Sequence, residues 1–249
     1  MGYHGVSGSL GLATGPIYGA WMAHWYGWRT AYLLLGGLAF LGFMFLLLYN
    51  HDKGPSSNRL KLKFSFSKPQ LIIITISALW SLAHHGLFNF LPYYFKDAVQ
   101  TPWSVVVMSG TLTGFVLILG IIGQLVGGRL GDHFQRKNVY IWVLGLNIPF
   151  LFIIAFLNGW PLVVIAGILG AVNFIFQPIH NSLLADVTVS ENRGIVYGFS
   201  AGISFGVGSM AGVIGGYIGD ILSINHIFPS MAVFLLPAVF LAIVLKKIL

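Results

Sequence analysis

The stretch "VVVMSGTLTGFVLILGIIGQLVGGRLGDHFQRK", residues 105–137, decides the fold class of this chain. No charged side chain occurs in it before Arg129. An uncharged apolar run of about 20 residues is long enough to cross the hydrocarbon core of a bilayer as a helix. The run ends in a short segment with four charged residues, Arg129, Asp132, Arg136 and Lys137. This pattern predicts a membrane-spanning helix followed by a loop at the membrane surface.

The rest of the chain repeats this pattern. Hydrophobic residues make up 57% of it and charged residues only 8%, against about 25% charged residues in an ordinary soluble domain. Long apolar runs cover residues 5–24, 30–49, 71–95, 105–130, 139–156, 161–185, 194–221 and 227–245. The runs are continuous and do not alternate between apolar and polar residues, which argues against a β-barrel. We predict an all-α integral membrane protein with about eight transmembrane helices.

The basic residues predict the orientation of these helices. Eleven of the 13 Lys and Arg residues fall in alternate connections or at the C-terminus: Lys53, Arg59, Lys61, Lys63, Lys68, Arg129, Arg136, Lys137, Arg193, Lys246 and Lys247. Only Arg29 and Lys96 fall on the other side. Because basic loops stay in the cytoplasm, both termini are expected there, in a plasma-membrane protein. The net charge of +7 is therefore a topology signal and does not indicate nucleic-acid binding.

One long polar connection divides the chain. The stretch "HDKGPSSNRLKLKFSFSKP", residues 51–69, combines basic residues with Gly54, Pro55 and Ser56, as linkers do. We expect residues 1–50 to form the last two helices of one bundle, residues 51–70 a cytoplasmic linker, and residues 71–249 a six-helix bundle.

The charged segment after residue 127 resembles the cytoplasmic loop motif of the Major Facilitator Superfamily. The matching residues are Gly128, Arg129, Asp132, Arg136 and Lys137, while His133 and Gln135 depart from the family pattern. The resemblance implies secondary transport by alternating access. It also implies that this segment joins the equivalents of helices 8 and 9, so that the chain holds the equivalents of helices 5 to 12 and lacks the first four. The chain is then a fragment of a longer transporter or a truncated relative.

Small residues in the first helix resemble a second motif of this superfamily, found in proton-coupled drug exporters. They are Gly11, Gly15, Pro16 and Gly19. Helix packing is the competing explanation, because small residues spaced by four let two membrane helices approach closely. Gly5, Gly11, Gly15 and Gly19 recur as Gly202, Gly208, Gly212 and Gly216 at a constant offset, as equivalent helices of two halves would.

Polar residues on two helices predict a substrate pathway, because polar groups inside a membrane seldom face lipid. They are Ser81, His84, His85, Asn89 and Tyr93 on one helix and Asn173, Gln177, His180 and Asn181 on the other. By the resemblance, these helices correspond to two that line the central cavity of the family. Hydrogen bonding between helices is the alternative for each residue.

The loop motif predicts a gate. The resemblance places Asp132 beside the start of the first helix, whose amide groups and dipole favour an anion. We expect Asp132, steadied by Arg129 or Arg136, to close the cytoplasmic side in the outward-facing state. Anchoring of the loop by its positive charges is the simpler explanation for Arg136 and Lys137.

These features together predict a secondary transporter of small molecules, with proton-coupled export of drug-like or amphipathic compounds favoured over uptake of organic acids or sugars. A truncated membrane protein that transports nothing is a further alternative. The substrate, protons and the lipid bilayer are the expected partners, and His84, His85 and His180 are the intramembrane groups suited to a proton relay. The same three histidines suggest a metalloenzyme, but their spacing matches no metal motif. No enzyme activity, metal or cofactor is expected.

Overall fold

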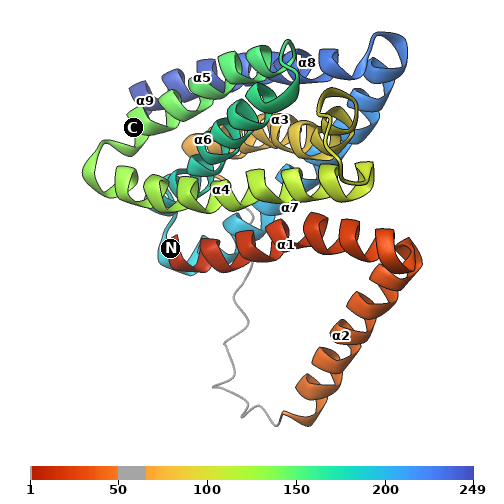
Figure 1. The fold of residues 1–249 in the computed structure, drawn as a ribbon. Helices are drawn as coiled ribbons and strands as arrows, with labels where there is room; N and C mark the ends of the chain where they lie inside the picture. The colour runs from red at the N-terminus through yellow and green to blue at the C-terminus, as the bar shows by residue number, and fades with distance from the viewer. Residues whose placement is uncertain (1, 50–65) are drawn as a thin grey trace.

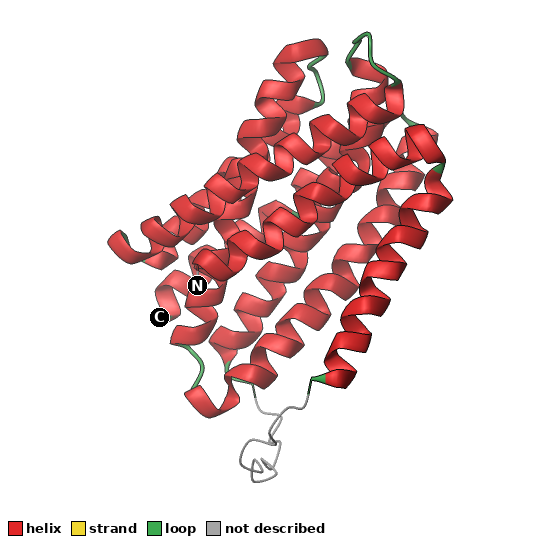
Figure 2. Ribbon diagram, turned by 60° about the horizontal axis from the view of Figure 1, so that its bottom comes forward, coloured by secondary structure: helices red, strands yellow, loops and turns green. Residues whose placement is uncertain are grey.

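The structure, a computed structural model, describes residues 2–49 and 66–249. The described residues form helices and short connections and contain no strand (Figure 2). Most of the predicted linker, residues 51–65, lies outside the described residues. In chain order the helices are α1 (Gly2–Tyr26), α2 (Trp28–Leu48), α3 (Lys68–Ala98), α4 (Val105–His133), α5 (Arg136–Ile154), α6 (Gly159–Asp186), α7 (Arg193–Ile221), α8 (Ile227–Val233) and α9 (Leu235–Ile248). Two short 3₁₀ turns, η1 (Ser190–Asn192) and η2 (Ile224–His226), precede α7 and α8.

The predicted all-α membrane fold is confirmed. In the described part of the chain, seven segments are long and apolar enough to cross a membrane: α2, α3, α4, α5, α6, α7 with η1, and η2 with α8 and α9. The first predicted segment also forms a helix, the 25-residue α1. The chain is thus an integral membrane protein.

Most predicted helix boundaries shift by one to three residues in the structure, and two of the differences have a clear physical cause. The third helix begins at Lys68, three residues earlier than predicted, because Ser67 and Gln70 form a capping box there. The last predicted helix is divided at Phe234 into α8 and α9. Pro237 explains the division, since it has no N–H to donate to the carbonyl four residues earlier.

The helices form a bundle with α1 and α2 on one side of it (Figure 1). Helix α4 packs between α1 and α6, α3 packs against α7 and α9, and α5 packs against α6 and α9. Helix α2 packs mainly against α1, and Ala31 is its one buried residue among those described. Gly27 joins α1 to α2 with a φ of 83°, a conformation that other residues rarely adopt.

Glycines of α4 allow the close contacts of this bundle. A Cβ on Gly114 would meet Ile17 and the carbonyl oxygen of Ala13 on α1. A Cβ on Gly123 would meet the carbonyl of Ala171 on α6. The glycines of α1 are not part of these contacts. A Cβ on Gly11, Gly15 or Gly19 would have no neighbouring atom within 4 Å. Close packing of α1 in this chain therefore depends on the glycines of its partner helix.

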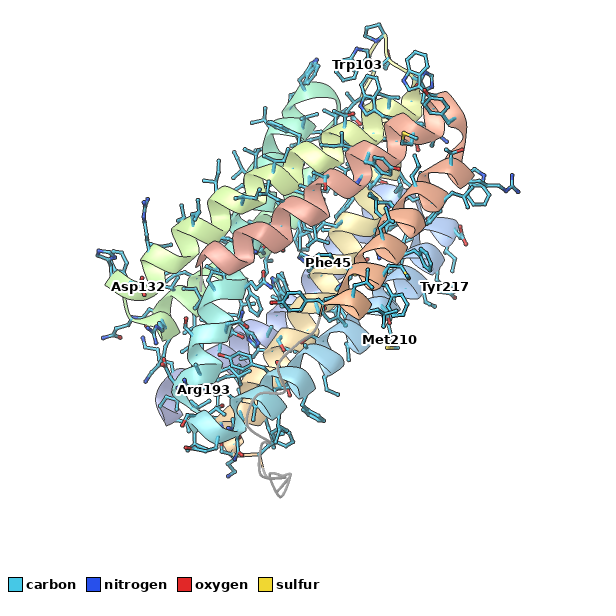
Figure 3. The ribbon with its side chains drawn as sticks, turned by 90° about the horizontal axis from the view of Figure 1, so that it is seen from below. Phe45, Trp103, Asp132, Arg193, Met210 and Tyr217 are labelled. Carbon is cyan, nitrogen blue, oxygen red and sulfur yellow. The ribbon has the colours of Figure 1, made fainter. Side chains whose placement is uncertain are left out.

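The two ends of the bundle differ in composition. Asp132 and Arg193 lie at one end, and Trp103 lies at the other (Figure 3). The exposed side chains Trp25, Tyr26, Trp28 and Trp160 also belong to connections at the Trp103 end. Tryptophan and tyrosine are enriched where a membrane meets water, so this end has the composition of an interfacial aromatic belt.

Candidate functional site

A chain of hydrogen bonds crosses the middle of the bundle from α3 to α5. His84 Nδ1 on α3 lies 2.6 Å from Asn173 Oδ1 on α6. Asn173 Nδ2 donates to Asn147 Oδ1 on α5 over 3.1 Å, and Asn147 Nδ2 donates to the carbonyl oxygen of Val143 over 2.7 Å. Asn147 is fully buried, Asn173 is 1% exposed, and His84 is half-buried. The side-chain amides of Asn147 and Asn173 are both fully paired, as burial in an apolar interior requires.

Aromatic rings surround the His84 end of this chain. Trp80 and Phe88 lie one turn of α3 to either side of His84, because a spacing of four residues keeps side chains on one face. Their ring centroids are 4.6 Å and 4.9 Å from that of His84, and the centroid of Phe174 on α6 is 5.6 Å away. The polar pair of His84 and Asn173 therefore lies beside flat apolar rings, with the ring of His85 5.3 Å from that of His84, centroid to centroid.

A second polar cluster lies nearer the Arg193 end, around His180. The hydroxyl of Tyr140 on α5 lies 3.1 Å from His180 Nδ1, and the hydroxyl of Ser200 on α7 lies 3.3 Å from Nε2. His180 is 7% exposed, and its ring is stacked on that of Phe176 at 5.3 Å. Phe176 is also stacked on Trp80 at 4.2 Å, so stacked rings connect this cluster to the one around His84.

A third polar contact joins α4 to α6. Gln124 Nε2 donates to Gln177 Oε1 over 2.7 Å. Gln124 is 2% exposed, and its Oε1 has no hydrogen-bond partner among the described residues. Gln177 is exposed. The Nε1 of Trp80 also has no partner in the described structure. Both are buried polar groups that no described residue satisfies.

The remaining predicted pathway residues form no hydrogen bond with these clusters, although the ring of His85 lies beside that of His84. His85 Nδ1 lies 2.9 Å from the carbonyl oxygen of Ser81 on its own helix and 3.1 Å from the Ser81 hydroxyl. Asn89 is exposed and Tyr93 is 62% exposed. The backbone carbonyl oxygen of Asn181 accepts a hydrogen bond from the hydroxyl of Tyr197 over 2.6 Å.

The structure therefore divides the predicted α6 stripe among four neighbouring helices. Asn173 turns to α3 and α5, Gln177 to α4, and His180 to α5 and α7. Sequence reasoning missed the partners of these residues: Gln124, Tyr140, Asn147 and Ser200. Asn147 and Gln124 had a usable signal, since each is an isolated amide in a long apolar run.

The three intramembrane histidines do not converge on one point. His84 and His85 lie side by side on α3 with ring centroids 5.3 Å apart. His180 has Tyr140 and Ser200 as its partners. Within residues 2–49 and 66–249 no group of three His, Cys, Asp or Glu side chains is placed to hold a metal ion.

The charged loop after α4 forms an ion pair with the end of α6. Arg136 Nη1 lies 2.8 Å from each carboxylate oxygen of Asp186, and Arg136 Nε donates to the carbonyl oxygen of Gly131 over 3.1 Å. Sequence reasoning had overlooked Asp186. Asp132 is exposed, and in the described chain no ion pair joins it to Arg129 or Arg136. Gly128, Arg129 and Lys137 belong to the same end of the bundle.

Asp132 lies close to the end of α4, and α1 begins beside this end of α4 (Figure 1). The contacts of Gly110 with Ala20 and of Gly114 with Ala13 show that α1 and α4 run antiparallel. The start of α1 and the loop with Asp132 are thus at one level of the bundle.

Long apolar helices with buried amides and imidazoles at mid-membrane define a polytopic membrane protein with a polar interior. The family model described as Major Facilitator Superfamily matches residues 1–121 and 103–248. The chain therefore belongs to the Major Facilitator Superfamily.

Similar proteins include characterised relatives and solved structures. The chain is 25% identical over 244 residues to the multidrug resistance protein MdtG of Proteus mirabilis, covering 94% of this chain and 59% of the relative. It is 30% identical over 160 residues to the class H tetracycline resistance protein of Pasteurella multocida, covering 62% of this chain and 38% of that protein. A crystal structure of the Escherichia coli fucose:proton symporter FucP shares the fold, with a TM-score of 0.65 and 15% identity over 87% of this chain and 55% of that one. The chain thus spans little more than half the length of MdtG and of FucP, and its match covers 38% of the tetracycline resistance protein.

Proposed function

We propose that this protein is a secondary active transporter that works by alternating access and exports drug-like or amphipathic compounds in exchange for protons. The observation that carries the proposal is the cluster around His84 and Asn173, where α3 meets α6 at mid-membrane. A polar group among aromatic rings suits a ligand with an apolar body and a few polar groups. Membership of the superfamily supports transport as the use of such a site.

The preference for export has two supports. Relatives that match most of this chain are named multidrug resistance proteins or efflux pumps. The glycine and proline spacing of α1, with Gly11, Gly15, Pro16 and Gly19, resembles the motif of proton-coupled exporters. These glycines have open faces, so α1 has room to approach another helix during a conformational change.

The division of the chain into parts and its orientation in the membrane belong to the same proposal. Residues 1–50 supply a helix pair, residues 51–70 a cytoplasmic connection, and residues 71–249 a six-helix bundle in the plasma membrane. The end with Asp132, Arg193 and Lys246 faces the cytoplasm, and so do both termini. This assignment is supported by the charges at that end and the tryptophans at the other.

The loop motif is proposed to gate the cytoplasmic side. Asp132 acts on the N-terminal amides and the dipole of α1 when that side closes. Arg136 holds the end of α6 through Asp186 and so fixes the loop from the other side. Gly128, Arg129 and Lys137 complete the loop.

Transport by energised vesicles tests the proposal. The protein is placed in inverted membrane vesicles, and a proton gradient, acidic inside, is imposed. Accumulation of an amphipathic cation or an antibiotic inside the vesicles, lost on adding an uncoupler, is the expected result. Accumulation of organic acids or sugars only under the opposite gradient would favour uptake. No movement of any compound would favour a membrane protein that does not transport.

A further inference from the structure

We propose that the Nε2 atom of His84 is a hydrogen-bond acceptor for an N–H or O–H group on an aromatic substrate. This inference rests on the proposed function, because it concerns what the mid-membrane cluster binds. Its basis is the direction of the hydrogen bonds between His84, Asn173 and Asn147, which fixes the position of the imidazole hydrogen.

The direction is set at the Asn147 end of the chain. A backbone carbonyl oxygen can only accept a hydrogen bond, so the atom 2.7 Å from the carbonyl of Val143 must be the amide nitrogen of Asn147. The amide oxygen of Asn147 then points to Asn173. That oxygen also only accepts, and the amide nitrogen of Asn173 supplies the hydrogen over 3.1 Å.

The same reasoning reaches the histidine ring. With its nitrogen used by Asn147, Asn173 presents its oxygen to His84 Nδ1 at 2.6 Å, so Nδ1 carries a hydrogen. A neutral imidazole has one N–H, which leaves a lone pair on Nε2. None of the described residues forms a hydrogen bond with Nε2. Asn147 and Asn173 are thus positioning residues that present an acceptor on the other side of the ring.

The surroundings of His84 indicate the class of ligand. The rings of Trp80, Phe88 and Phe174 lie within 5.6 Å of the imidazole, centroid to centroid, and offer flat apolar contact. Aromatic partners prefer offset-stacked or edge-to-face contact with such rings. A planar aromatic compound with an N–H or O–H at its edge fits this arrangement. The same compound without that hydrogen leaves the Nε2 lone pair unpaired.

The experiment compares two dyes that differ only in methylation. A diamino rhodamine methyl ester carries N–H groups, while tetramethylrhodamine methyl ester carries none and is otherwise the same cation. Binding of each dye to the protein in lipid nanodiscs is followed by fluorescence polarisation. We expect the wild-type protein to bind the diamino dye roughly two- to tenfold more tightly, the range for one hydrogen bond.

Two variants connect this preference to the proposed atoms. His84→Phe keeps an aromatic ring and is expected to abolish the preference by weakening the diamino dye alone. Asn147→Leu is expected to reduce the preference without any contact with the dye, because it frees the orientation of Asn173. Two matched controls should keep the preference. His24→Phe changes an exposed histidine on α1, and Asn138→Leu changes an asparagine near the start of α5.

The outcomes separate this inference from the proposed function. Equal binding of both dyes to the wild-type protein, or a preference that survives His84→Phe, overturns the role of His84 and leaves transport of apolar cations standing. Binding of neither dye overturns the proposed ligand class and the inference with it.

A measurement without ligand tests the geometry. Nitrogen-15 NMR of labelled histidine in nanodiscs, assigned by loss of one signal in His84→Phe, should show His84 with its hydrogen on Nδ1. A hydrogen on Nε2 in the neutral ring contradicts the proposal.

Discussion

Arg136, the first residue of α5, holds Asp186, the last residue of α6, through one guanidinium nitrogen that lies 2.8 Å from both carboxylate oxygens. The contact joins two residues that are 50 positions apart in the sequence. It fixes the loop after α4 to the far end of α6 at the end of the bundle that also carries Asp132.

Breaking this ion pair should destabilise the protein only slightly. The side chains of Arg136 and Asp186 are 34% and 49% exposed, so water and salt screen their attraction. We expect Asp186→Asn to lower the free energy of unfolding by about 0.2 to 1 kcal/mol in a thermal or denaturant assay. In an Arg136→Gln background the same change should have almost no effect. A full effect in both backgrounds would show that Asp186 acts through another group.

The packing of α1 on α4 can be tested by cross-linking, because the sequence contains no cysteine. Ala13 and Leu117 share one buried cluster with Phe174. The double variant Ala13→Cys with Leu117→Cys should react with a short bifunctional thiol reagent and yield a cross-linked product. Leu12→Cys with Leu117→Cys is the control, since Leu12 is 60% exposed and should not cross-link efficiently. Equal yields from both pairs would contradict the observed face of α1.

Phe176 should be among the most costly residues to truncate. It is 2% exposed and its ring stacks on those of Trp80, Tyr140 and His180. Phe176→Ala leaves a cavity and should lower the free energy of unfolding by about 3 to 5 kcal/mol. Phe152→Ala at a 43% exposed position should cost clearly less. Similar losses from the two variants would show that Phe176 is not packed as described.

The hydroxyl of Tyr140 should stabilise the protein through His180. Tyr140→Phe removes the partner 3.1 Å from Nδ1 and leaves a buried nitrogen unpaired, at a cost of about 1 to 3 kcal/mol in free energy of unfolding. In a His180→Leu background, Tyr140→Phe should lower the free energy of unfolding much less, because the nitrogen is then absent. A double-mutant cycle of the two changes measures this difference. Tyr217→Phe, at a 69% exposed position, is the control for removing a hydroxyl. Additive losses in the cycle would rule out coupling between the two residues.

Asp132→Asn tests the proposed gate. Removing a charge beside a helix start weakens an interaction of about 0.3 to 1 kcal/mol. The ratio of outward-facing to inward-facing protein should therefore fall by roughly two- to fivefold, measured by labelling of single cysteines on each side. Asp97→Asn removes a charge at the C-terminal end of α3, at the opposite end of the bundle from Asp132, and should leave this ratio unchanged. An unchanged ratio in Asp132→Asn would leave the loop with an anchoring role alone.

The prediction of helices succeeded where the pattern was local. Each apolar run became helical, the last one as the two helices α8 and α9, because a chain in lipid must satisfy its backbone hydrogen bonds within the segment itself. The early start of α3 and the break at Phe234 were readable in principle from Ser67, Gln70 and Pro237. The glycines of α4 were not recognised as the contact surface, since their spacing alone does not say which partner they face.

The polar residues show which features follow from the sequence and which require the tertiary structure. The sequence by itself determined that the protein is an all-α membrane protein, and that His84, Asn173 and His180 lie within its apolar segments, because both follow from length, hydropathy and periodicity along one helix. Only the tertiary structure decided that His84 meets Asn173 and Asn147, that His180 meets Tyr140 and Ser200, and that Arg136 meets Asp186. These partners come from other helices, and the rotation and depth of each helix in the bundle are set by side-chain packing against its neighbours, which no pattern within one segment specifies.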